Sequence, residues 1–423
     1  MPVPTLRPFR GLRYDPRAGE LSRLICPPYD VIGVADRDRL LARDPHNAVR
    51  VEFPVLPGHE NGGYAQAARM LASWRKAGAM RVDASPSLYV YEEHYRLGQA
   101  PERVQRGVFG RLLLEPLGDG IRPHERTLSA PKEDRLRLLR ATATNTSPII
   151  LLSDAGPALA GQLDPVTRAT PDAVATDDAS VTHRLWVVPG EHPAAAAIAD
   201  VVSSAPLTIA DGHHRYETAL RYREESGASS GDAPSRPEDF VLALVLGVGA
   251  DDGPTILPTH RVLRGDPALA TEVIRSVHGT FRVEHRAVAD VVRGYAPPFP
   301  GGPGRIGVVT SSHAGELVLD RGEVDRLLGR ETPRAVRSLD VAVLDAVLRP
   351  LVEDHPDITV SYTHDAAEAA DAVGKGDVIA AFLLAPTALE SVVAVAAAGA
   401  VMPQKSTYFY PKAATGLVMY PLE

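Results

Sequence analysis

The amino-acid sequence predicts an α/β fold of the mixed α+β kind. Through most of the 423 residues, apolar runs typical of strands alternate with segments whose apolar residues recur at helical spacing. This alternation disfavours a helical bundle and a β-sandwich. A hydrophobic content of 44 % supports a substantial core, and the length allows two or three domains or one elaborated α/β unit.

The periodicity of apolar residues predicts the elements in chain order. Residues 47–54 have strand character, with Arg50 and Glu52 on one face. Residues 63–77 carry the apolar face of a helix, which includes Trp74. The further elements expected are a strand pair (88–95 and 107–114), a strand and a helix around an Asp-Gly turn (205–210 and 213–223), a hairpin (305–310 and 316–319), a helix (341–351), a buried strand (377–384) and a buried helix (391–402).

Two breaks rich in Gly, Pro and Ser divide the chain. Residues 226–235 are typical of a surface loop, and residues 296–304 are typical of a linker. We therefore expect a main α/β region at 1–295 and a C-terminal α/β region at 305–423 that packs back onto the first.

Composition narrows the class of protein. A net charge of −8 without a long basic run argues against nucleic-acid binding. The single cysteine, Cys26, cannot form an internal disulfide, and the first residues lack the apolar segment of a signal peptide, so we expect a cytoplasmic protein. The most apolar window, residues 391–402, is shorter than the roughly 20 residues that span a bilayer, and no membrane partner is expected.

The most informative segment is the strand, turn and helix start around residue 212. Gly212 permits an unusual backbone angle after Asp211, and His213, His214 and Arg215 then occupy the first helical turn. Unpaired backbone N–H groups and the positive end of the helix dipole favour a phosphate or carboxylate there, and a guanidinium can bind such a group with two hydrogen bonds. The alternative is ordinary turn and cap chemistry.

Polar residues in two earlier segments are candidates for the same site. Two prolines stiffen the turn at 26–32, which can present Tyr29 and Asp30 to a ligand, although a plain structural turn fits equally well. Glu125 and Arg126 belong to a polar cluster that can reach a metal or a phosphate, or form a solvated face.

Further candidates lie towards the C-terminus. His260 follows an apolar strand, where α/β proteins bind small molecules, and a cap is its alternative role. Lys405 and Ser406 suit a phosphate, and Tyr408 or Phe409 offers a ring face, but no P-loop pattern is present. No HExxH or CxxC spacing indicates zinc, and magnesium held by carboxylate and phosphate oxygens fits the pattern better.

These segments together resemble a large prokaryotic family, the domain-of-unknown-function family numbered 1015. The resemblance extends from end to end of the chain. Its hallmarks are PPYDVI (27–32), HERT (124–127), KEDRL (132–136), ADGHHRYETA (210–219) and MPQKSTYFYPK (402–412). The family name leaves the activity open.

The DGHHR segment alone is similar to a motif of the ParB and sulfiredoxin superfamily, which includes free-serine kinases. This resemblance implies a ParB/sulfiredoxin-like core elaborated by additional mixed-sheet segments. It also implies that residues 211–215 bind nucleotide phosphates, with Asp211 near magnesium. The resemblance identifies no catalytic carboxylate; Glu52, Glu125 and Asp30 are candidates, and Glu125 is preferred because His124 and Arg126 flank it.

We therefore expect a phosphotransferase that uses ATP or ADP with Mg²⁺ and acts on the hydroxyl of serine or a similar polar metabolite. A phosphatase or nucleotide hydrolase, and a nucleotide-sensing regulatory protein without turnover, are the alternatives. The residues expected to take part are Glu125, His213 and His214 in catalysis, Asp211, Gly212, Arg215, Lys405 and Ser406 at the nucleotide, and Tyr29, Asp30, Arg126 and His260 at the substrate.

Overall fold

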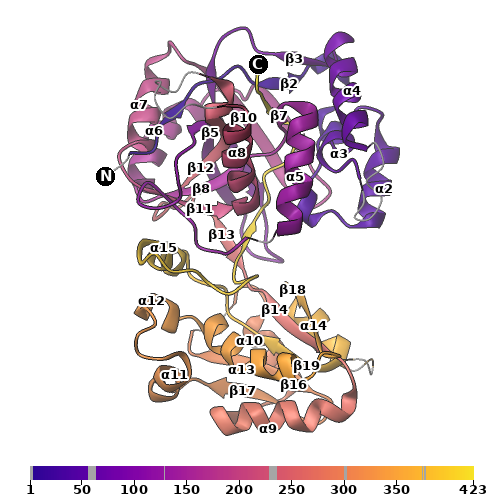
Figure 1. The fold of residues 1–423 in the computed structure, drawn as a ribbon, viewed down its shortest axis with the longest axis vertical. Coiled ribbons are helices and arrows are strands. Elements are labelled where there is room, and N and C mark those ends of the chain that lie inside the picture. The colour runs from indigo at the N-terminus through magenta and orange to yellow at the C-terminus, as the bar shows by residue number, and fades with distance from the viewer. Residues whose placement is uncertain are drawn as a thin grey trace.

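Two β-sheets of unequal size organise the chain (Figure 1). The structure, a computed structural model, describes residues 3–55, 63–127, 129–227, 236–299, 303–373, 375 and 378–423. Helices cover both sheets, so the mixed α/β class predicted from the sequence is confirmed.

The large sheet has nine strands in the order β6-β11-β8-β12-β5-β4-β10-β9, with β1 paired to β5. Most pairs are antiparallel, whereas β12 with β8 and β11 with β6 are parallel. Its strands are β1 (Leu6–Arg7), β4 (Ser87–Tyr95), β5 (Arg103–Leu113), β6 (Ile121–Arg122), β8 (Ile149–Ser153), β9 (Ala173–Thr176), β10 (Thr182–Pro189), β11 (Leu207–Asp211) and β12 (Phe240–Gly247).

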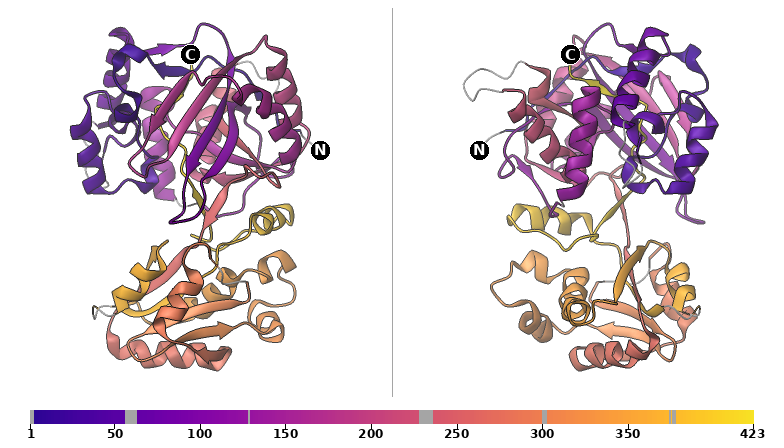
Figure 2. Two further views of the ribbon diagram at one scale, coloured as in Figure 1. Left: turned by 180° about the vertical axis from the view of Figure 1, so that it is seen from behind. Right: turned by 45° about the vertical axis from the view of Figure 1, so that its right-hand side comes forward.

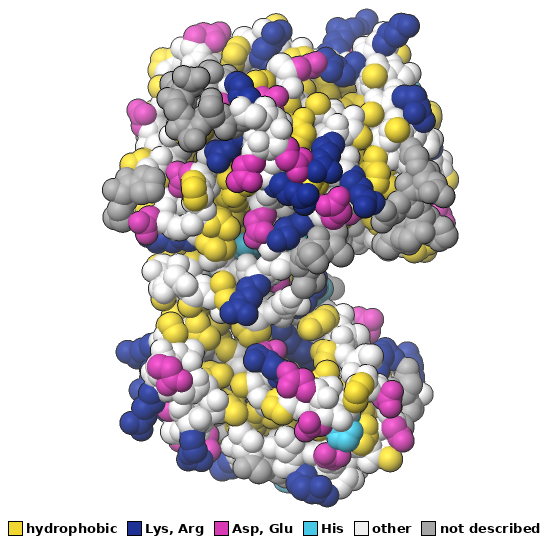
Figure 3. Space-filling model, in the orientation of Figure 1, with side chains coloured by type: hydrophobic (Ala, Val, Ile, Leu, Met, Phe, Trp, Pro, Cys, Tyr) yellow, Lys and Arg dark blue, Asp and Glu magenta, His cyan; other side chains and the backbone are white. Residues whose placement is uncertain are grey.

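Four helices accompany the large sheet. The apolar residues of α6 (Gly156–Thr167) and α7 (Pro193–Val202) share one core with alternate residues of its strands, as the two-residue period of a strand requires. Helix α5 (Ser129–Thr142) lies beside α8 (His213–Glu225), and ion pairs such as Arg140 with Glu225 join them. Figure 3 shows Lys, Arg, Asp and Glu side chains interspersed over this face of the molecule.

The N-terminal helices form a separate core beside the large sheet. They are α1 (Leu21–Leu24), α2 (Val34–Arg43), α3 (Val49–Glu52) and α4 (Gly63–Lys76). The strand β2 (Leu12–Tyr14) precedes them in the chain, β3 (Met80–Val82) follows them, and the two strands pair as a ribbon. Leu71, Trp74 and Met419 are buried in this core. The strand predicted at 47–54 is wrong, because Val49 and Val51 are buried in this core as part of a short helix and the Asn47 side chain accepts from the Val49 N–H.

The small sheet has six strands in the order β15-β17-β16-β19-β14-β18. They are β14 (His260–Arg264), β15 (Arg282–His285), β16 (Arg305–Thr310), β17 (Ala314–Val318), β18 (Thr359–Thr363) and β19 (Val378–Leu383). Its helices are α9 (Ala270–Thr280), α10 (Val288–Tyr295), α11 (Arg321–Leu328), α12 (Arg334–Arg337), α13 (Asp340–Asp354) and α14 (Ala366–Val373). The chain passes to this sheet after β13 (Thr255–Leu257), so residues 260–295 belong to the small sheet. The predicted division into regions 1–295 and 305–423 stays a prediction about which parts of the chain fold independently.

The C-terminal segment returns to the large sheet (Figure 1 and Figure 2). After α15 (Leu389–Ala397), β20 (Tyr408–Tyr410) pairs with β13, and β21 (Tyr420–Pro421) pairs with β7 (Thr144–Asn145). The β13–β20 ribbon therefore joins the two sheets. Among the described residues, no helix combines the length and the apolar character needed to cross a membrane.

Several predicted elements agree closely with the structure. The helix at 63–77 is α4, the strand pair is β4 and β5, and the hairpin is β16 and β17. The predicted helix at 341–351 lies within α13, the strand at 377–384 is β19, and the buried helix at 391–402 is α15, which ends earlier, at Ala397. Most of the predicted loop at 226–235 and the centre of the linker at 296–304 lie outside the described residues.

Candidate functional site

The turn between β11 and α8 forms as the sequence predicts. β11 ends at Asp211, Gly212 adopts a φ of 92°, and α8 begins at His213. The first hydrogen bond of the helix runs from the Tyr216 N–H to the Gly212 carbonyl oxygen. The N–H groups of residues 213–215 precede this bond, so the helix itself provides them no acceptor, and they are available to an anion.

Three charged side chains form a compact group at this turn. Asp211 accepts from the Arg215 guanidinium through one carboxylate oxygen and from the Lys412 ammonium through the other, each at 2.5 Å. We call Asp211, Arg215 and Lys412 the Asp211 triad; their side chains are 15 %, 11 % and 10 % exposed. Burial alone would raise the pKa of Asp211, but the Lys412 and Arg215 cations hold it well below its usual value. With its carboxylate ionised, the triad carries a net positive charge.

Two histidines behind the turn are neutral. The His124 N–H donates to His213 Nε2 at 3.2 Å, and the two ring centroids lie 4.7 Å apart. His124 Nδ1 lies 2.6 Å from the Ile209 carbonyl oxygen and Nε2 lies 3.1 Å from the Thr407 hydroxyl. Burial lowers the pKa of His124 to about 4 and that of His213 well below its usual value. At neutral pH both imidazoles are therefore hydrogen-bonding groups rather than cations.

Glu125 lies against the C-terminal loop that the sequence singled out. Its Oε1 accepts from the Lys405 N–H at 3.3 Å, and Glu125 forms a parallel bridge with Met402. Burial raises the pKa of Glu125, opposed by Lys405. The Ser406 hydroxyl is buried and donates to the Pro403 carbonyl oxygen at 2.5 Å, so it closes the loop, and its contact with a phosphate stays a prediction.

The PPYD turn faces the triad from the N-terminal helices. Tyr29 and Asp30 open a short 3-10 helix, Tyr29–Val31, and the Tyr29 ring lies 3.9 Å from the Arg135 guanidinium. The exposed Asp30 carboxylate acts electrostatically on Arg215, Lys412 and His214. Asp30 therefore faces the cationic side of the site.

Glu52, a candidate catalytic carboxylate, is held by hydrogen bonds inside the protein, and a part in catalysis stays a prediction. It is completely buried, and its oxygens accept from Thr146 at 2.5 Å, Ser147 at 2.9 Å and the Tyr29 N–H at 3.2 Å. These three donors satisfy the carboxylate and fix the turn that carries Asp30.

Several residues of the site were missed from the sequence. Lys412 is the most important, and Glu217 is another, since it accepts from Thr127 at 2.9 Å and from Lys132 at 2.8 Å. Tyr408 lies with its ring centroid 4.9 Å from the Lys412 ammonium and 3.8 Å from the ring of His364. The MPQKSTYFYPK motif contains both residues: Tyr408 was already a candidate ring face, whereas nothing local distinguishes Lys412 from Lys405.

The remaining predicted residues lie at the margins. Arg126 and Lys405 are exposed, and neither side chain has an ion pair among the described residues. His214 is half-buried, and burial lowers its pKa. His260 lies in the small sheet, with Nδ1 accepting from the Leu384 N–H at 3.1 Å, and is separated from the triad by His364 and Tyr408.

A magnesium ion on Asp211 would have to displace a cation, because both carboxylate oxygens already accept from Arg215 and Lys412. In the described part of the chain, no three His, Cys, Asp or Glu residues are arranged to hold a metal. Asp211 as a magnesium ligand stays a prediction.

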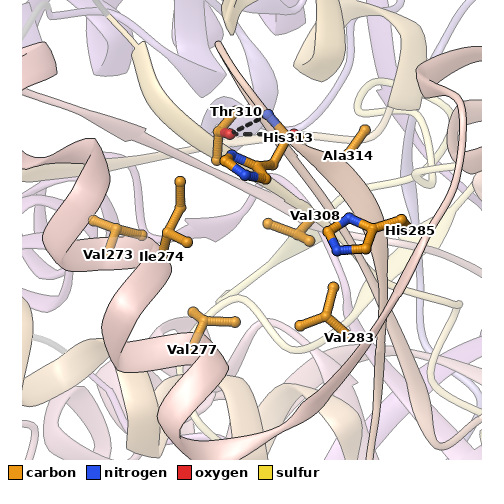
Figure 4. A pocket seen from close by; sticks show the side chains of 9 residues that line it. All are labelled: Val273, Ile274, Val277, Val283, His285, Val308, Thr310, His313 and Ala314. Atoms are coloured by element: carbon orange, nitrogen blue, oxygen red, sulfur yellow. Dashed lines mark hydrogen bonds between the residues drawn. The ribbon is translucent and has the colours of Figure 1, made fainter.

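One pocket borders the Asp211 triad, and another lies in the small sheet. The first is small and open to solvent, and it is lined by Arg135, Ser147, Arg215 and Thr218 among others, so it borders the triad through Arg215. The other lies in the small sheet between α9 and the strands; Figure 4 shows mostly apolar side chains around it, with His285 and His313. It includes none of the residues of the triad.

The fold and the site define a two-sheet α/β protein with a buried cationic group at a helix N-terminus. The chain belongs to the family described as protein of unknown function (DUF1015), whose model matches residues 6–342. No curated protein matches the sequence. The resemblance found from the motifs is thereby confirmed, and the C-terminal motif lies beyond the matched residues.

Among solved structures, a free serine kinase in complex with AMP is 14 % identical with a TM-score of 0.36, and the match covers 70 % of this chain and 89 % of that one. SbnI from Staphylococcus aureus, truncated at its C-terminus, is 12 % identical with a TM-score of 0.37, covering 74 % and 87 %. A conserved hypothetical protein from Pyrococcus furiosus is 14 % identical with a TM-score of 0.35, covering 73 % and 91 %.

Proposed function

We propose that this protein is a nucleotide-dependent phosphotransferase that acts on the hydroxyl group of a small polar metabolite such as serine. One observation carries the proposal: at the N-terminus of α8, Lys412 and Arg215 both bind the buried carboxylate of Asp211. Backbone N–H groups, a helix dipole and a net positive triad form the electrostatic surroundings that a polyphosphate requires.

The nucleotide phosphates bind at the first turn of α8 in this proposal. Lys405 and Arg126 are exposed cations, and in this proposal they neutralise phosphate oxygens. The neutral imidazole of His213 accepts through Nε2, so its ring proton is on Nδ1 and can be donated to an oxygen. Magnesium, carried by the phosphates, supplies further charge neutralisation.

Glu125 is the proposed base. Its raised pKa suits a carboxylate that takes up a proton during the reaction, and Lys405 holds it in place. The acceptor hydroxyl transfers its proton to Glu125 as its oxygen forms a bond with the terminal phosphorus. The bond from that phosphorus to the bridging oxygen breaks, and the shortened nucleotide, a diphosphate from ATP or a monophosphate from ADP, leaves with the electron pair.

The test combines binding and turnover on the full chain. Thermal unfolding is followed with ATP, ADP and Mg²⁺, and phosphorus NMR then follows ATP with serine. A nucleotide-dependent rise in melting temperature and a new phosphomonoester are expected. Inorganic phosphate alone identifies a hydrolase, stabilisation without turnover identifies a sensor, and no stabilisation by any nucleotide rejects the proposed site.

Lys405→Ala provides the first variant, because its ammonium has no ion pair in the described part of the chain. A hydrogen bond to a charged phosphate contributes about 1.5–3 kcal/mol, so nucleotide affinity is expected to fall roughly tenfold or more. Lys76→Ala, on the exposed end of α4, is the matched control and should leave affinity unchanged. Equal affinities in the two variants would remove Lys405 from the site.

A further inference from the structure

A cavity of about 430 Å³, open to solvent, is lined by residues of α11, α12 and α13. These three helices lie against one another beside the small sheet (Figure 1). Pockets that bind small molecules typically have volumes of about 300–1,000 Å³. The lining of this cavity includes no residue of the Asp211 triad, of the five sequence motifs or of the pocket in Figure 4. It is therefore a candidate ligand site separate from the one at α8.

Three arginines line the cavity. Arg321 is the first residue of α11, and Arg334 and Arg337 are the first and last residues of α12. Arg337 is held in place, because it forms an ion pair with Asp325 and its Nε donates to the Thr332 carbonyl oxygen at 2.9 Å. Arg321 and Arg334 are exposed, and neither side chain has an ion pair or a hydrogen bond in the described part of the chain. Their guanidinium groups are thus available to a ligand.

The cavity carries an excess of positive charge. Its lining contains two carboxylates, and one of them, that of Asp325, is already paired with Arg337. The other belongs to Asp340, the first residue of α13, and accepts from the Gly304 N–H at 2.9 Å. Burial raises the pKa of Asp340 to about 6, so its charge is easier to neutralise than that of an ordinary aspartate. Even with both carboxylates ionised, the guanidinium groups outnumber them, and the cavity attracts anions.

The number of donors favours a phosphate group over a carboxylate. A guanidinium group donates two parallel hydrogen bonds to a pair of oxygens. A carboxylate has only two oxygens, which one guanidinium group can occupy. A phosphate monoester has three terminal oxygens, and these can accept from two guanidinium groups at once. The two available arginines, Arg321 and Arg334, therefore suit a phosphate better.

One part of the cavity lining is apolar. Leu319, Val324 and Val343 line it together with the arginines. Val324 and Val343 are buried in the core of the small sheet, and Leu319 packs against that core, so their positions are fixed. Apolar groups of a ligand gain binding free energy when they cover such a surface. A ligand that joins a phosphate to an apolar group can use both kinds of contact.

We propose that this cavity binds a small phosphate monoester with an apolar organic group. Arg321 and Arg334 bind the phosphate oxygens, and Leu319, Val324 and Val343 contact the organic group. The site is distinct from the proposed nucleotide site at α8 and does not depend on the proposed phosphotransferase function. The small-sheet region thereby has a ligand of its own.

The test is calorimetric titration of the full chain with phenyl phosphate, inorganic phosphate and benzoate. Phenyl phosphate is expected to bind most tightly, because it alone offers both a phosphate and an apolar group. Arg321→Gln and Arg334→Gln should each weaken its binding severalfold, and the double variant at least tenfold. Arg326→Gln is the matched control, since Arg326 is exposed on the same helix but pairs with Glu323 and does not line the cavity. Thermal unfolding of each variant checks that the fold is kept.

A second variant separates the two anion sites. Lys405→Ala weakens the proposed site at α8 and should leave the binding of phenyl phosphate to the cavity unchanged. If affinity falls in Lys405→Ala but not in the double arginine variant, phenyl phosphate binds at α8 and the cavity proposal is wrong. It is also wrong if phenyl phosphate does not bind, or binds equally to the double variant and to Arg326→Gln. Equal affinity for benzoate would overturn the assignment to phosphate, and equal affinity for inorganic phosphate would overturn the contact with an apolar group.

Discussion

Lys412 forms an ion pair with Asp211 across 201 residues of sequence, with the ammonium nitrogen 2.5 Å from a carboxylate oxygen. Both side chains are largely buried, and Arg215 occupies the other carboxylate oxygen. The C-terminal segment is thereby tied to the turn at which α8 begins. Stability and the electrostatics of the site thus depend on the same three side chains.

Lys412→Met should destabilise the protein by about 2–4 kcal/mol. Removing one partner of a buried ion pair typically costs about 3–5 kcal/mol, and the remaining Arg215 offsets part of that. Urea unfolding at pH 7 measures the change. Arg326→Met, which breaks an exposed pair with Glu323, serves as control and should cost less than about 1 kcal/mol. Equal losses in both variants would show that the buried pair adds nothing.

Stability should fall as the pH decreases from about 6.5 towards 4, and His124 contributes to this fall together with His213 and His260, whose pKa values burial also lowers. The pKa of His124 in the folded state is about 4, below the usual 6.5. Between these two values the unfolded chain binds the proton and the folded protein does not, so the free energy of unfolding decreases as the pH falls. The difference amounts to roughly 3 kcal/mol when the window is crossed. His124→Gln should make this part of the pH profile less steep, while His192→Gln, at an exposed position, should not change it. If the slope of the unfolding free energy against pH is unchanged in His124→Gln, other residues are responsible for the acid sensitivity.

Gly212→Ala should weaken nucleotide binding more than it destabilises the fold. A side chain at a φ of 92° is strained by about 1–2 kcal/mol, and the new Cβ would lie 3.0 Å from Ile149 and 3.1 Å from Arg215. Gly227→Ala is a matched control with a φ of 75° and nothing within 4 Å. Unfolding should report similar strain in both, whereas affinity should fall only in Gly212→Ala. A fall in nucleotide affinity in both variants would show that the effect comes from a general loss of stability and not from the turn at Gly212.

Glu125→Gln should abolish turnover and leave nucleotide affinity within about twofold. The amide keeps an oxygen for the Lys405 N–H but cannot take up a proton. In the unmodified protein, turnover should fall as the pH decreases through the raised pKa of Glu125, because protonation removes the base. Glu323→Gln, on an exposed helix, is the control. Full activity in Glu125→Gln would exclude it as the base.

The local features of the fold were predictable, and the long-range ones were not. The Asp-Gly turn into α8 depends on Gly212 and on a short apolar strand, both visible in one segment. Strand character at 47–54 came from alternating valines, but burial among helices overrode that tendency. Lys412 escaped notice because its partner lies in another segment, and a lysine beside aromatic residues is equally typical of a surface.

Glu52 illustrates a second difficulty. A carboxylate near a polar motif suggests chemistry, yet its role depends on whether donors from elsewhere satisfy it. Here Thr146 and Ser147, almost a hundred residues further along, provide them. Each of the five motifs could be recognised separately in the sequence, but only the structure shows which of their residues contact one another.

The β13–β20 ribbon connects the proposed ligand site with the small sheet. Tyr408 belongs to the ribbon itself, and Lys412 follows it by two residues. A bend of the ribbon would thus shift Tyr408 and the ammonium group of Lys412 relative to Asp211. A ligand that contacts Tyr408 or Lys412 would bind most tightly to the arrangement of the ribbon that suits it best, so the free energy needed to reach that arrangement is subtracted from the binding free energy.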